Sequence, residues 1–166
     1  PIGSVPRFQF VGNKKPVNAF VEMCRDGIVK RGLVGVGEIY RQRLEKEIRL
    51  IASKDYADYF LIVAEIVNWA KSQGILVGPA RGSSAGSLVC YLTGITEIDP
   101  IKHDLLFERF IDESRFDLPD IDIDFEDRRR AEVKRHIIEM YGEDKVCSVI
   151  TFARFKGKNS LDEIGK

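Results

Sequence analysis

The segment Pro119–Phe125, PDIDIDF, constrains the fold of this 166-residue chain more than any other feature. Three apolar side chains alternate strictly with three acids, namely Ile121, Ile123 and Phe125 with Asp120, Asp122 and Asp124. Because successive side chains of a β-strand point to opposite faces, this alternation predicts a half-buried strand with one apolar and one acidic face. We therefore expect a sheet that packs one face against a core.

Three carboxylates on one strand face repel one another, because same-face neighbours lie only about 6–7 Å apart. At an effective dielectric of about 20, each such pair costs on the order of 2 kcal/mol. Divalent cations with oxygen ligands relieve this repulsion, and the spacing suits two ions shared by carboxylates, as in two-metal phosphoryl transfer. Two other interpretations stay open, a solvated edge strand whose acids prevent aggregation and a purely structural Ca²⁺ site.

A second feature is the glycine- and serine-rich segment GPARGSSAGS, residues 78–87. Glycines permit close backbone approach, and free N–H groups at a helix start can hold phosphate oxygens. We expect Ser83 or Ser84 to cap a helix that ends at Gly94, with Arg81 as an additional donor. The segment is neither a P-loop nor a G-x-G-x-x-G motif, so a simple helix cap with packed small residues is the alternative. Together with the acidic strand, it predicts a site for chemistry on a nucleoside triphosphate.

Composition limits the other function classes. Lys plus Arg and Asp plus Glu both number 26, so no global field draws the chain to nucleic acid or a membrane. Cys24, Cys90 and Cys147 form no C-x-x-C pair, which argues against a disulfide framework or zinc knuckle and favours a reducing, cytoplasmic setting. No apolar run approaches the roughly 20 residues of a membrane helix, so no membrane partner is expected.

The remaining pattern predicts one compact unit. We expect helices over 16–30, 38–54, 58–73 and 127–141, strands over 75–77 and 145–152, weak helical character over 154–166, and an irregular lead-in or cloning scar over 1–15. The helix over 38–54 is amphipathic, and Arg43 and Glu47 are assigned to its polar, solvent-facing side. Asp58 is expected to cap the third helix, and Met140 to point inward from the last one.

Two further sets of residues have an ordinary structural interpretation. His103 and His136 are isolated in sequence, which favours core or surface roles over metal ligation. The basic residues between 128 and 135 are expected to form a solvated helix face, with contact to a nucleic-acid backbone as the alternative.

Three motifs closely resemble the palm region of the C family of replicative DNA polymerases, the alpha subunits of bacterial DNA polymerase III. They are YFLIVAEIVNWAKSQGILVGPARGSSAGSLVCYLTGITEIDPI, LLFERFIDESR and LPDIDIDF, and the resemblance covers residues 40–166. It implies an α/β (α+β) fold, a nucleotidyltransferase-like palm with a mixed β-sheet flanked by helices, similar to polymerase beta. The palm would occupy residues 16–152, with 153–166 leading toward a thumb.

The resemblance also implies template-directed addition of deoxynucleotides. The partners would be primer–template DNA, deoxynucleoside triphosphates, and other domains and subunits of a replicase. The cofactor would be two Mg²⁺ ions, with Mn²⁺ as a substitute. Two alternatives are a non-catalytic nucleotide- or metal-binding module that keeps the palm framework, and a small nucleotidyltransferase with another acceptor.

Carried over by position, Asp120 and Asp122 resemble the catalytic, metal-binding aspartates of the family, and Asp124 is a third metal ligand that some members replace. The residues that resemble the family's triphosphate-binding elements are Arg81, Gly82, Ser83, Ser84, Ser87, Arg109 and Lys158. Ala80 stands where the family commonly has glycine. In the family a third catalytic aspartate lies far downstream, outside this sequence.

Overall fold

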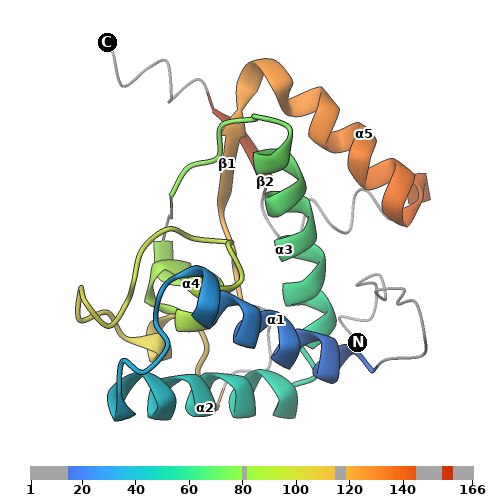
Figure 1. Cartoon of the computed structure of the whole chain (residues 1–166). Helices are drawn as coiled ribbons and strands as arrows, with labels where there is room; N and C mark the ends of the chain where they lie inside the picture. The colour runs from blue at the N-terminus through green and yellow to red at the C-terminus, as the bar shows by residue number, and fades with distance from the viewer. Residues whose placement is uncertain (1–14, 80–81, 115–118, 145–154, 159–166) are drawn as a thin grey trace.

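The computed structural model describes residues 15–79, 82–114, 119–144 and 155–158 (Figure 1). In chain order the elements are α1 (Pro16–Lys30), α2 (Glu38–Ser53), α3 (Ala57–Ser72), the 3₁₀ turn η1 (Gly82–Gly86), α4 (Leu88–Leu92), η2 (Phe107–Arg109), β1 (Ile123–Glu126), η3 (Asp127–Arg129), α5 (Arg130–Tyr141) and β2 (Phe155–Lys158). The fold is mixed α/β and largely helical. Within the described ranges no helix is long and apolar enough to cross a membrane.

Helix α3 is the centre of the core, as its apolar residues on most sides predict. Its neighbours α1 and α5 lie on two sides of it in Figure 1. Phe20 of α1 contacts Phe60 with a ring separation of 5.8 Å, and His136 of α5 stacks on Trp69 at 4.0 Å. His136 therefore has the core role that the sequence favoured.

The sheet is small and centred on β1. Strand β2 pairs with β1 in parallel, from Ile123 opposite Phe155 to Glu126 opposite Lys158. On the other side Val77 forms an antiparallel bridge with Phe125. The described residues therefore form a two-stranded parallel sheet with one antiparallel bridge beside it, and the larger mixed sheet of a palm stays a prediction.

Residues 155–158 contradict the weak helical character predicted for 154–166. Pairing with β1 overrides the local preference, because it satisfies the backbone hydrogen bonds of a segment that is distant in sequence. The strand predicted over 145–152 lies outside the described residues.

The predicted helix starts were wrong at two positions. Helix α3 begins after Tyr56, so Asp58 lies buried in the first turn instead of capping the helix. Ser83 and Ser84 lie within η1, and the residue that caps α4 is Ser87, whose hydroxyl accepts from the Cys90 N–H at 3.1 Å. The α-helix begins only after η1, whose last residue, Gly86, packs against the backbone of Leu106.

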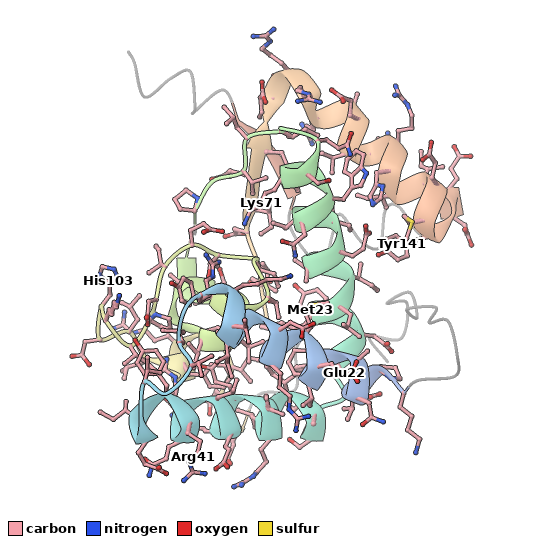
Figure 2. The ribbon with its side chains drawn as sticks, in the orientation of Figure 1. Glu22, Met23, Arg41, Lys71, His103 and Tyr141 are labelled. Carbon is pink, nitrogen blue, oxygen red and sulfur yellow. The ribbon has the colours of Figure 1, made fainter. Side chains whose placement is uncertain are left out.

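The inward direction predicted for Met140 was also wrong, since this side chain is 50% exposed. Tyr141 takes the inward position at the end of α5 and donates to Glu65 of α3 at 2.9 Å. Figure 2 shows Tyr141 between the end of α5 and α3. Tyr141 rather than Met140 therefore faces α3, because its hydroxyl has a hydrogen-bond acceptor there.

Candidate functional site

The acidic segment has the alternation that its sequence predicts. Ile121, Ile123 and Phe125 are buried, whereas Asp120 is exposed and Asp122 and Asp124 are partly exposed. Only the second half of the segment is in the ladder, because β1 begins at Ile123. Of the three acids, Asp120 is thus the most exposed, whereas Asp122 and Asp124 are partly covered.

Tyr59 of α3 supports the start of this segment from below. Its buried hydroxyl donates to the Pro119 carbonyl at 2.8 Å. Burial raises the pKa of Tyr59, and the negative charges of Asp120 and Asp122 raise it further, so the hydroxyl keeps its proton across the physiological range. Tyr59 thus holds the backbone from which the acids project.

The glycine-rich loop lies directly against the acidic segment. Gly82 has φ +67°, in the left-handed region, and a Cβ at this position would lie 3.6 Å from Asp122 Oδ2. A Cβ on Gly78 would lie 3.3 Å from the Cβ of Asp124, and the Gly78 N–H donates to the Asp124 carbonyl at 2.9 Å. Two features more than thirty residues apart in sequence thus lie side by side, and in Figure 1 the segment that leads into the loop passes alongside β1.

The three loop serines differ in their environment. Ser83 is partly exposed, whereas Ser84 and Ser87 are fully buried. The Ser87 hydroxyl donates to Glu47 Oε1 at 2.8 Å while it accepts from the Cys90 N–H. Ser87 therefore shapes the backbone between η1 and α4, and Ser83 is the loop serine with an accessible side chain.

Arg109 is exposed at the end of η2, on a segment that touches the loop. A Cβ on Gly86 would lie only 2.4 Å from the Leu106 carbonyl oxygen, so the two backbones pack without an intervening side chain. This contact places the Arg109 segment beside η1. Arg81 lies outside the described residues, and Lys158 is placed only through its backbone, opposite Glu126.

Among the residues that the structure describes, no three His, Cys, Asp or Glu side chains are grouped to hold a metal ion. The acidic face nevertheless has the donor chemistry of a hard cation, because Asp120, Asp122 and Asp124 offer carboxylate oxygens. The missing Cβ of Gly82 leaves space beside Asp122 Oδ2. These residues therefore fit Mg²⁺ or Mn²⁺ as part of a ligand set.

Glu47 and Arg43 were predicted to face solvent, and this prediction was wrong. Glu47 is fully buried, and this burial raises the pKa of its carboxyl group above the ordinary value. The N–H groups of Val89 and Leu88 and the Arg43 guanidinium act in the opposite direction, because they stabilise the charged form. The signal was present in the spacing, because position 47 follows Leu44 by three residues and precedes Ile51 by four. An acid at such a core position of a helix needs a polar partner.

A glycine-rich loop that leads into a helix, in a mixed α/β fold, is a common element of domains that bind phosphate-bearing ligands. Residues 18–166 match the family described as the bacterial DNA polymerase III alpha NTPase domain. The chain therefore belongs to the bacterial DNA polymerase III alpha family.

Similar proteins include the DNA polymerase III subunit alpha of Mycobacterium tuberculosis (strain CDC 1551 / Oshkosh), which is 52% identical over 137 residues, 82% of this chain and 12% of the relative. The protein of the same name from Ureaplasma parvum serovar 3 is 47% identical over 148 residues, 87% of this chain and 15% of the relative. The one from Staphylococcus aureus (strain MRSA252) is 48% identical over 129 residues, 78% of this chain and 12% of the relative. The chain thus spans less than a sixth of the length of these relatives.

Proposed function

We propose that this chain is the palm, the catalytic core, of a replicative DNA polymerase. It would add deoxynucleotides to the 3′ end of a primer on a DNA template, in the bacterial cytoplasm, together with other domains and subunits of a replicase. The proposed palm has the nucleotidyltransferase-like architecture of polymerase beta. The observation that carries the proposal is the position of Gly82 beside Asp122 in a chain that belongs to this family. A Cβ added to Gly82 would lie 3.6 Å from Asp122 Oδ2.

Each site residue has a proposed role. Asp120 and Asp122, with Asp124 beside them, would hold two Mg²⁺ ions, which supply a lowered pKa for the primer hydroxyl and charge neutralisation for the phosphates. The loop backbone at Gly82 and the Ser83 hydroxyl would hold triphosphate oxygens. Arg81, Arg109 and Lys158 would neutralise phosphate charge, while Ser84 and Ser87 would shape the loop from within.

The test is calorimetric titration of the chain with a deoxynucleoside triphosphate, with and without Mn²⁺. We expect binding that requires Mn²⁺ and weakens at least about tenfold in Asp120→Asn and Asp122→Asn, a loss of about 1.4 kcal/mol or more. Glu139→Gln, which removes an exposed acid of α5, is the matched control and should bind like the parent chain. Equal affinity in all four proteins would contradict the proposal.

Enzyme activity is tested separately from binding. In a chimera, this chain replaces the matching segment of the Staphylococcus aureus alpha subunit, to which it is 48% identical. We expect the chimera to extend a primer and Asp120→Asn in it to abolish extension. Metal-dependent binding without extension by a folded chimera would favour a non-catalytic nucleotide-binding module instead.

A further inference from the structure

The carboxylate of Glu47, in the middle of α2, is completely buried and accepts four hydrogen bonds. Oε1 accepts from Ser87 Oγ at 2.8 Å and from the Val89 N–H at 2.9 Å. Oε2 accepts from the Leu88 N–H and from Arg43 Nε, both at 2.8 Å. This one side chain therefore binds the N-terminus of α4, directly after the glycine-rich loop.

Arg43, one helical turn earlier, extends the network to a second segment. Its Nη2 donates to the Gly86 carbonyl at 2.5 Å and to the Leu105 carbonyl at 2.9 Å. Gly86 is the last residue of η1, and Leu105 begins the segment that carries Arg109. A single guanidinium thus bridges the end of the glycine-rich loop and the segment that carries Arg109.

We propose that Arg43 and Glu47 are positioning residues of the triphosphate site. They set the spacing between the glycine-rich loop and the Leu105–Arg109 segment without touching the ligand. This inference rests on the proposed function, because it names the residues that hold the two sides of that same site.

The geometry goes beyond what capping α4 requires. Ser87 already caps this short helix through its hydroxyl. The bond from Arg43 to the Leu105 carbonyl adds nothing to α4, and it spans 62 residues of sequence. The planar fork of arginine holds two carbonyls and a carboxylate in fixed, separate directions, whereas the three donors of a lysine ammonium all radiate from one nitrogen.

The test uses a double variant that leaves no unpaired charge. In Arg43→Met/Glu47→Leu both partners become apolar groups of similar size, which buried ion pairs often tolerate. The matched control is Arg41→Met/Glu45→Leu, because this pair has the same spacing on the same helix with an Nη1–Oε1 distance of 2.8 Å but is exposed. Figure 2 shows Arg41 on the outer side of α2.

Two measurements are made on each protein, amide hydrogen exchange and Mn²⁺-dependent binding of a deoxynucleoside triphosphate. In the Arg43→Met/Glu47→Leu variant we expect exchange to accelerate at least about tenfold over 82–89 and 105–110, with α3 unchanged, and triphosphate affinity to fall about fivefold or more. Arg43→Lys keeps a cation beside Glu47 and should accelerate exchange over 105–110 in particular. The control variant should match the parent chain in both measurements.

The inference is overturned if both segments exchange as in the parent chain, or if α3 accelerates equally, which would show a loss of global stability alone. It is also overturned if the loop loosens while triphosphate affinity stays the same. If the parent chain itself binds no triphosphate, the proposed function fails in this chain, and the exchange data still decide whether Arg43 and Glu47 position the two segments. Should the double variant not fold, Arg43→Lys provides the same comparison.

Discussion

Glu47 illustrates at the level of single residues how an ionisable side chain becomes part of a core. It stands in line with Leu44 and Ile51 on α2 and has no exposed surface. Removing the carboxylate from water costs free energy, and this cost is offset because four hydrogen-bond donors surround the carboxylate. One of these donors is the cation of Arg43. Removing one member of this network is therefore expected to cost more than the whole network contributes.

We predict that Glu47→Leu destabilises the chain by about 3 kcal/mol, because Arg43 and the N–H groups of α4 lose their acceptor in a buried place. Glu45→Leu, two residues earlier on the exposed side of α2, is expected to change stability by less than about 0.5 kcal/mol. Urea unfolding followed by circular dichroism measures both values. Equal midpoints for the two variants would show that the Glu47 network contributes no stability.

At the level of elements, the glycine-rich loop requires glycine at two positions, Gly82 and Gly86. Gly82 is at φ +67°, where a side chain is strained, whereas a side chain on Gly86 would collide with the Leu106 carbonyl. The first lies at the proposed ligand, and the second lies where two segments cross. This distinction permits a test that separates strain from binding.

Gly82→Ala is expected to cost about 1–2 kcal/mol of stability, the usual cost of a left-handed alanine, and to place a methyl group beside Asp122. Gly32→Ala is the matched control, because Gly32 has φ +69° and no atom within 4 Å of its missing Cβ. We predict similar stability losses in thermal unfolding but weaker Mn²⁺–triphosphate binding in Gly82→Ala alone. Comparable binding by both variants would place the ligand away from Gly82.

At the level of the whole molecule, polar contacts between distant segments complement the apolar core around α3. Tyr40 of α2 donates to Asp99 Oδ2 at 2.7 Å across 59 residues of sequence. Arg31 and Lys71 both pair with Glu97, which joins the ends of α1 and α3 to one loop. These contacts connect segments that no local pattern relates.

Tyr40 gives this organisation a pH dependence. Burial and the hydrogen bond to Asp99 raise the pKa of Tyr40 to about 12. Because this lies above the ordinary value of about 10, the folded state holds the proton more tightly, and the resulting stability is complete below pH 10 and lost as the pH rises through 12. Between pH 10 and pH 12 we therefore expect the free energy of unfolding, measured with urea, to fall less in Tyr40→Phe than in the parent chain. An identical pH profile for the two proteins would contradict this prediction.

Features that depend on nearby residues were predictable from the sequence alone. The helix over 16–30, the burial of α3 and the alternation from Ile121 to Phe125 are periodicities that short segments determine by themselves. The motifs around the glycine-rich loop and PDIDIDF likewise predicted the family to which the chain belongs. The match over residues 18–166 confirms this prediction. The catalytic role of Asp120 and Asp122 stays a prediction, because it depends on a ligand and on a chemical step.

Other features were decided only by tertiary structure. The cap of α4 moved to Ser87 because Glu47 and the Leu106 backbone meet the chain there. Residues 155–158 form a strand because their backbone pairs with that of β1. Local sequence by itself determined the helices α1, α2 and α3 and the acidic alternation of β1. The position of Gly82 beside Asp122 required the whole chain, because contacts between distant segments form only when the core brings them together.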